Sequence, residues 1–99
     1  MDTQHPTIQD LQRLAATIRC DIIRMIYRAG AGHPGGALSA ADLITALYFR
    51  VMRLDPQNPA WAERDRFILS KGHACPAWYA ALARRGYFPL TELDTLRQL

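Results

Sequence analysis

The sequence predicts an α/β chain that is mostly helical, with one short strand near residues 66–70. Apolar residues recur every three or four positions from Ile8 to Ala29, which is typical of a long amphipathic helix. The run Phe67-Ile68-Leu69 has a β-branched centre and is bounded by charge and glycine, which favours a buried strand. Because one strand cannot form a sheet, we expect its neighbours to lie outside these 99 residues.

The amino-acid composition and charge argue against several classes of protein. The 99 residues amount to one domain, and their hydrophobic content is that of a globular chain. The net charge of +3 is spread as single arginines, which argues against a nucleic-acid binder. No apolar run approaches the roughly 20 residues needed to span a bilayer, and the N-terminus lacks the apolar centre of a signal peptide. The two cysteines do not form a disulfide framework, so we expect a reduced, cytoplasmic setting.

The first predicted helix should end at Gly30, where a left-handed residue costs little. Asp10, Arg13, Asp21 and Arg28 are interpreted as its solvated face. We therefore expect none of these four charged side chains to be buried.

A second helix is predicted after the stretch "GAGHPGGAL", whose four glycines and one proline break the first. Ser39 begins this helix, and Asp42 three residues on would complete a capping box. From Ser39 to Met52 the segment is apolar on nearly every side, which indicates a helix buried between other elements.

A third helix is predicted after the strand. Pro76 is tolerated in its first turn, and Arg84 and Arg85 suit the negative end of its dipole. Gly86 is its expected C-cap. The closing segment "LTELDTLRQL" carries leucines at helical spacing and predicts a last helix over 90–99.

Two of the three histidines lie in glycine turns. In "SKGHACP" a strand would lead through Gly72 into a helix N-terminus, which can bind an anion such as a phosphate or diphosphate. Lys71 and His73 would add donors, and Gly72 would let a ligand approach the backbone. The alternative is an ordinary turn with a surface lysine and a histidine that caps the helix.

The second turn, "GHPGG", holds His33 between glycine and proline, where it could serve as a donor or proton carrier. The alternative is a rigid turn between helices whose histidine bonds a nearby carbonyl. Neither turn has the ligand spacing of a metal site. Cys75 near a histidine admits a nucleophile, but a small buried thiol in the first turn of a helix is the simpler interpretation.

Three stretches resemble the start of transketolase: "AGAGHPGGALSAADLITALYF", "DPQNPAWAERDRFILSKGHACPAWYAALARRGYF" and "LTELDTLRQL". The likeness runs from about Leu11 to Leu99 and is nearest to the N-terminal subunit of split, two-subunit transketolase-like proteins. The pairing of GHPGG-x-x-S-x-x-D with DRF-x-LSKGH is specific. The sister enzyme 1-deoxyxylulose-5-phosphate synthase has related turns, so a fragment of that kind is an alternative.

The resemblance implies that residues 1–99 form the N-terminal part of a thiamine diphosphate-binding three-layer α/β/α domain, incomplete at its C-terminus. It implies a transferase that moves a two-carbon ketol unit from a ketose phosphate to an aldose phosphate, as in the pentose phosphate pathway. His33 would contact the substrate in catalysis. His73 would bind thiamine diphosphate near its diphosphate, with Ser70, Lys71 and Gly72 shaping the site.

Two functional features of the transketolase pattern, the metal motif and the activating glutamate, are missing from this sequence. The family holds Mg²⁺ with a Gly-Asp-Gly motif and a downstream asparagine, neither of which occurs here, so the metal ligands are expected outside this chain. The activating glutamate belongs to a second domain. A C-terminal transketolase subunit or domain is therefore an expected partner, in a homodimer or heterotetramer, and the chain alone should be inert. The competing hypothesis is a non-enzymatic helical interaction module that binds a partner through residues 39–52.

Overall fold

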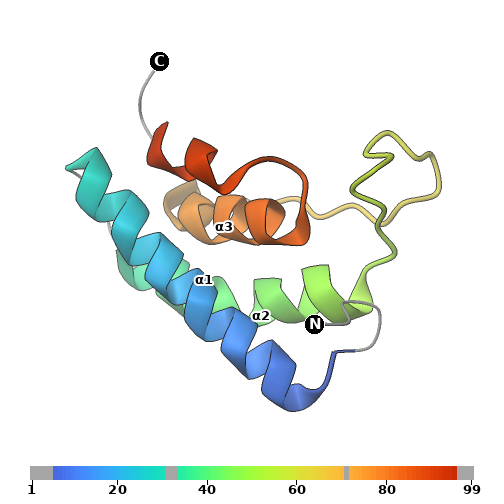
Figure 1. Cartoon of the computed structure of the whole chain (residues 1–99), viewed down its shortest axis with the longest axis horizontal. Coiled ribbons are helices and arrows are strands. Elements are labelled where there is room, and N and C mark those ends of the chain that lie inside the picture. The colour runs from blue at the N-terminus through green and yellow to red at the C-terminus, as the bar shows by residue number, and fades with distance from the viewer. Residues whose placement is uncertain (1–5, 31–33, 71, 96–99) are drawn as a thin grey trace.

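The computed structural model describes residues 6–30, 34–70 and 72–95, and this part of the chain is mostly helical, as predicted. Its α-helices α1 (Ile8–Ala29), α2 (Pro34–Ala46) and α3 (Cys75–Arg85) pack around one core. A π-helical turn, η1 (Leu47–Val51), extends α2, and the 3-10 segments η2 (Gly72–Ala74) and η3 (Leu90–Thr95) flank α3. Figure 1 shows α1 crossing α2, with the loop after η1 projecting to one side. No helix in the described ranges could cross a membrane.

Helix α1 begins and ends with defined caps. Thr7 Oγ1 accepts a hydrogen bond from the Asp10 amide at 3.0 Å, and the Asp10 carboxylate accepts one from the Thr7 amide at 3.0 Å. This capping box satisfies two N–H groups that have no partner inside the helix. At the other end Gly30 adopts φ 74° and donates its amide to Ile26 and Tyr27. The predicted end at Gly30 is confirmed.

The assignment of Asp21 to a solvated face is wrong, because its side chain is only 3% exposed. Position 21 lies three residues after Ile18 and four before Met25, so it shares their core-facing side of the helix. Arg84 of α3 meets the carboxylate in a bidentate pair, with Nε and Nη2 each 2.8 Å from one oxygen. This hydrogen bonding raises the pKa of Arg84. The pair compensates the burial of the Asp21 charge and joins α1 to α3.

Helix α2 starts five residues earlier than predicted. Pro34 is its first residue, a position where the fixed proline φ suits a helix. Ser39 therefore lies inside the helix, where its hydroxyl donates to the Gly36 carbonyl at 2.9 Å. Asp42 does not cap the helix, and its carboxylate lies 2.6 Å from Arg19 of α1. The predicted Ser39–Asp42 capping box is wrong.

The apolar segment after Ser39 is buried on one side only. Ile44, Tyr48 and Phe49 lie in the core, where they pack with α1 and α3. Leu43 and Val51 are 64% and 65% exposed, although the sequence predicted burial all round. The described residues supply packing partners for just one face of this segment.

The predicted strand near residues 66–70 is absent, and residues 64–70 have no regular secondary structure. Strand hydrogen bonds come from a neighbouring strand, and no strand lies elsewhere in the described ranges. Ile68 is 85% exposed, which contradicts the predicted burial. The loop is tied at its base, where the Arg53 amide donates to the Asp65 carboxylate at 2.6 Å and the Asp65 amide donates to the Arg53 carbonyl at 2.9 Å.

Phe67 anchors the end of this loop in a cluster of three aromatic rings. Its ring meets Tyr48 and Trp78 edge-on, with centroids 6.1 Å and 5.5 Å away. Trp78 Nε1 also donates to the Tyr48 hydroxyl at 2.6 Å. Burial raises the pKa of Tyr48, although the hydrogen bond from Trp78 acts in the opposite direction. The hydroxyl is therefore neutral at physiological pH.

Helix α3 follows its prediction, with Pro76 in the first turn and Gly86 as a left-handed C-cap at φ 106°. Arg85 lies in the last turn, and its Nε donates to the Tyr48 carbonyl at 3.0 Å. The closing segment forms a 3-10 helix over Leu90–Thr95, with Leu93 in the core. The rest of the helix predicted over 90–99 lies outside the described residues.

We expect Asp21→Asn to lower the free energy of unfolding by about 2–4 kcal/mol, because it leaves the Arg84 charge without its partner. The matched control is Asp94→Asn, which breaks the Arg28–Asp94 pair, whose side chains are 51% and 40% exposed. That loss should stay below about 1 kcal/mol. Urea denaturation followed by circular dichroism measures both, and equal losses would contradict a dominant role for the buried pair.

The raised pKa of Tyr48 predicts a stability change at high pH. Unfolded tyrosine ionises near pH 10, whereas folded Tyr48 keeps its proton to a higher pH. The free energy of unfolding should therefore be unaffected by this group below about pH 10 and fall as the pH rises further. Tyr48→Phe should flatten part of that fall. Tyr87, whose pKa burial also raises, and Arg84, whose pKa the Asp21 hydrogen bond raises, contribute to the rest. An unchanged slope in Tyr48→Phe would contradict the assignment.

Candidate functional site

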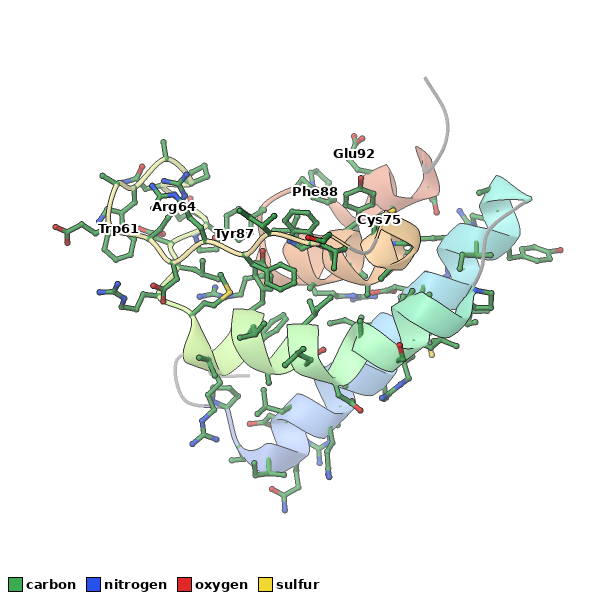
Figure 2. The ribbon with its side chains drawn as sticks, turned by 180° about the vertical axis from the view of Figure 1, so that it is seen from behind. Trp61, Arg64, Cys75, Tyr87, Phe88 and Glu92 are labelled. Atoms are coloured by element: carbon green, nitrogen blue, oxygen red, sulfur yellow. The ribbon has the colours of Figure 1, made fainter. Side chains whose placement is uncertain are left out.

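The turn predicted to bind an anion leads directly into α3. Ser70 and Gly72 are exposed, and η2 begins at Gly72 and joins α3 at Cys75 (Figure 2). Ala74 occupies the N-cap position, and no side-chain hydrogen bond caps the helix there. A Cβ at Gly72 would meet no other atom of the described chain within 4 Å. The backbone is therefore open at Gly72, and anion binding by the N–H groups that lead into α3 stays a prediction.

Lys71 lies outside the described residues, and of His73 the structure describes the backbone alone. His33 also lies outside them. Its neighbour in the chain, Pro34, begins α2, and α2 packs against η2. The structure therefore brings together the elements that flank the two glycine-histidine turns, although they are some 40 positions apart in the sequence.

Small residues allow this close approach. Ala37 and Ala41 of α2, Ala74 of η2 and Ala77 of α3 are all fully buried at 0% exposure. Because alanine side chains end at Cβ, the backbones of packed helices can lie near each other. The 3-10 segment η2 consequently packs against both α2 and α3.

Cys75 is the first residue of α3 and is partly buried as a free thiol. The simpler interpretation, a small thiol in the first turn of a helix, agrees with this position. Among the described residues, no group of three or more histidine, cysteine, aspartate or glutamate side chains is arranged to hold a metal ion.

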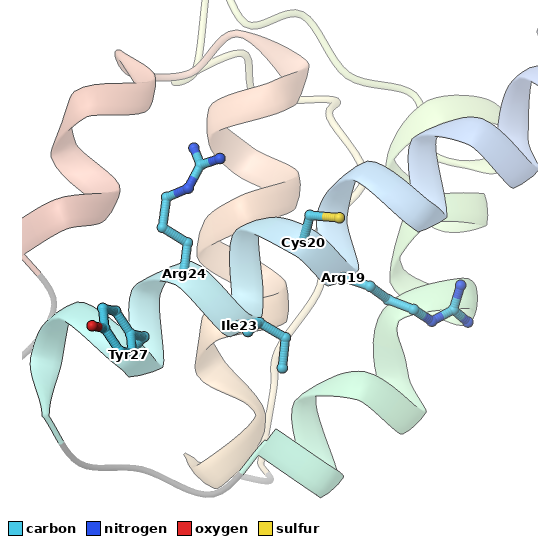
Figure 3. A pocket seen from close by; sticks show the side chains of 5 residues that line it. All are labelled: Arg19, Cys20, Ile23, Arg24 and Tyr27. Carbon is cyan, nitrogen blue, oxygen red and sulfur yellow. The ribbon is translucent and has the colours of Figure 1, made fainter.

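One pocket of about 480 Å³ lies on the outward face of α1, away from the core (Figure 3). Cys20, Ile23 and Tyr27 form its apolar lining, with Arg19 and Arg24 at its edges. All of these residues belong to α1, and the sequence prediction did not include this pocket.

A second pocket, of about 340 Å³, lies where the end of the loop meets η1 and α3. Tyr48, Phe67 and Leu82 line it, together with Arg64 and Arg66. Figure 2 shows Arg64 on the loop, far from the start of α3 at Cys75. A third pocket, of about 150 Å³, separates α1 from η3 beside the Asp21–Arg84 pair.

Sequence reasoning missed two interactions that α3 makes with other elements. The spacing of Asp21 relative to Ile18 and Met25 could have placed it on the buried side of α1. Nothing in the sequence pairs Tyr48 with Trp78, because the two residues are 30 positions apart and belong to different elements. Their hydrogen bond follows from the packing of η1 against α3.

The sequence aligns with known proteins along most of its length. The family model described as "Transketolase, thiamine diphosphate binding domain" matches residues 10–99. The chain is 55% identical over 89 residues to 6-deoxy-6-sulfo-D-fructose transketolase subunit SqwG of Clostridium sp. (strain MSTE9), covering 90% of the chain and 32% of that protein. It is 39% identical over 89 residues to an apulose-4-phosphate transketolase subunit of Phocaeicola vulgatus, covering 90% of the chain and 32% of that protein.

Human transketolase is 41% identical over 103 aligned positions, which cover 100% of the chain and 16% of the human protein. The chain thus spans about a third of the two subunit relatives and a much smaller share of the human enzyme. The match across residues 10–99 shows the family, and the chain belongs to the transketolases, within their N-terminal thiamine diphosphate binding domain.

Proposed function

We propose that this chain supplies the first section of a transketolase that transfers a two-carbon ketol unit from a ketose phosphate to an aldose phosphate. The observation that carries the proposal is the packing of α2, which follows His33 in the chain, against η2, which contains Gly72 and His73. The element that follows His33 in the chain and the element that contains His73 are thereby in contact. The family membership makes this the expected place for cofactor and substrate.

The residues present fit the diphosphate of thiamine diphosphate. The N-terminus of α3 lacks a side-chain cap, and the backbone at Gly72 is open. Both features suit an anion held by backbone N–H groups and favoured by the helix dipole. When bound, the cofactor supplies an electron sink for cleavage of the carbon–carbon bond beside a ketose carbonyl.

The protein side of the reaction is divided between the two turns. His73, with Ser70, Lys71 and Gly72, would hold and orient the diphosphate, and a protonated donor there would form charge-assisted hydrogen bonds. His33 would donate to the substrate hydroxyls and carbonyl and carry a proton during transfer.

A partner completes the proposed enzyme. Two relatives are each named as one subunit of a transketolase, and the chain covers 32% of each. The Mg²⁺ ligands and the neighbouring strands would come from the rest of the α/β/α cofactor-binding domain. The activating glutamate would come from a C-terminal subunit or domain. We propose a homodimer or heterotetramer that works in the cytoplasm, as for enzymes of the pentose phosphate pathway.

The sugar is the less defined part of the proposal. One relative is named for 6-deoxy-6-sulfo-D-fructose and another for apulose-4-phosphate, and both substrates are ketoses with an anionic group. A sugar phosphate or a similar anionic ketose is therefore the proposed donor class. The shared requirement is a carbonyl next to the carbon–carbon bond that breaks.

We expect the isolated 99-residue chain to be inert in a transketolase assay. The second domain and the metal ligands expected for the family are supplied by other segments, so activity should appear only when they are added. A coupled assay with ketose and aldose phosphates, thiamine diphosphate and Mg²⁺ measures this. Turnover by the purified chain alone would contradict the division of the site between chains.

In the assembled enzyme, His33→Ala should lower kcat/KM by about 100-fold or more while thiamine diphosphate still binds. His73→Ala should weaken cofactor binding by about 10- to 100-fold, the effect of losing a charge-assisted hydrogen bond. Steady-state kinetics and isothermal titration calorimetry separate the two effects. The matched control is His5→Ala, which replaces the remaining histidine and should change neither quantity.

If His33→Ala and His73→Ala have the same kcat/KM and the same cofactor affinity as His5→Ala, the proposed roles of both histidines are ruled out. In that case the interaction-module hypothesis, with the exposed Leu43 and Val51 as contacts, would account better for the chain.

A further inference from the structure

The rings of Tyr48, Phe67 and Trp78, here called the aromatic cluster, join three separate elements. Tyr48 belongs to η1, Phe67 to the end of the loop, and Trp78 to α3. Phe67 packs edge-on against both other rings, with interplanar angles of 80° and 82°. The indole of Trp78 is fixed further by its hydrogen bond to the Tyr48 hydroxyl at 2.6 Å.

This cluster lies at the base of the proposed cofactor turn. Phe67 precedes Ser70 by three residues, and Trp78 follows His73 by five. Their ring centroids are 5.5 Å apart, so the segment between them forms a loop whose two ends are held together. Because Ser70 and Gly72 are exposed, their positions depend on two neighbouring supports, the packing of η2 against α2 and the aromatic cluster.

Tyr48 also holds α3 at a second point. Its carbonyl accepts a hydrogen bond from Arg85 Nε at 3.0 Å, while its hydroxyl accepts one from Trp78. Tyr48 is 5% exposed and lies in the core. One residue of η1 therefore contacts α3 near its first turn and again in its last turn. These contacts fix the direction of the helix whose N-terminus faces the proposed diphosphate.

We infer that Tyr48, Phe67 and Trp78 are positioning residues that hold Ser70 and η2 in the arrangement that binds the cofactor diphosphate. The inference rests on the proposed function, since it assigns the cofactor to this turn. None of the three residues needs to touch the cofactor. They act by restricting the motion of Ser70 and η2 before the ligand binds, which reduces the free energy needed to order these residues on binding.

The test compares Trp78→Phe with Trp61→Phe in the assembled enzyme, with thiamine diphosphate and Mg²⁺ as the probe. Trp78→Phe keeps an aromatic ring beside Phe67 but removes the N–H donor. Trp61→Phe makes the same replacement on the loop, outside the aromatic cluster, and these are the two tryptophans of the chain. Calorimetry should show cofactor binding about three- to tenfold weaker in Trp78→Phe alone, as expected for one lost hydrogen bond.

Two further readouts separate positioning from general stability. Backbone amides of residues 72–74 should exchange hydrogen faster in cofactor-free Trp78→Phe than in Trp61→Phe. In kinetics, saturating thiamine diphosphate should restore kcat of Trp78→Phe, and the KM for the sugar should be unchanged. A purely structural defect would lower the melting temperature without this dependence on cofactor concentration.

A double variant tests the hydrogen bond itself. If the Trp78–Tyr48 bond is what matters, Tyr48→Phe combined with Trp78→Phe should bind the cofactor no more weakly than Trp78→Phe alone. Additive losses would overturn the role of this bond. Equal cofactor affinity and equal exchange in Trp78→Phe and Trp61→Phe would overturn the whole inference. Failure of the unmodified enzyme to bind thiamine diphosphate would instead reject the proposed function, and the inference with it.

Discussion

The buried pair of Asp21 and Arg84 is the contact on which the helical arrangement depends. A carboxylate that is 3% exposed is costly to bury unless a cation meets it. Arg84 meets it with two hydrogen bonds of 2.8 Å, which fix both the distance and the rotation of α3 relative to α1. Apolar packing has no preferred direction, whereas the two parallel hydrogen bonds require a defined orientation of Arg84 relative to Asp21. Helix α2 packs against both α1 and α3.

Once α1 and α3 are fixed, the alanines of α2, η2 and α3 determine how closely the remaining elements approach. Their full burial lets α2 lie against η2, and the two glycine-histidine turns adjoin these elements. The same core residues thus stabilise the fold and provide the base of the candidate site. Tyr48 gives α3 two further contacts, through its hydroxyl and its carbonyl. The site is consequently supported by side chains that belong to the core.

The segment near residues 66–70 shows how a correct local pattern can fail to give the expected structure. Phe67, Ile68 and Leu69 have the composition of a strand, and Phe67 does pack inward against Tyr48 and Trp78. A strand also needs a neighbour for its backbone hydrogen bonds, and the described residues offer none. Ile68 is left exposed for the same reason.

The sequence by itself determined the long first helix with its end at Gly30, and the third helix with Pro76 and Gly86. These features depend on residues close together in the chain, through helical periodicity, proline and left-handed glycine. Only the tertiary structure decided that Asp21 pairs with Arg84, that residues 66–70 form no strand, and that Tyr48 bonds Trp78. Each of these outcomes depends on packing between segments distant in sequence, and local patterns carry no information on which distant partner a side chain meets.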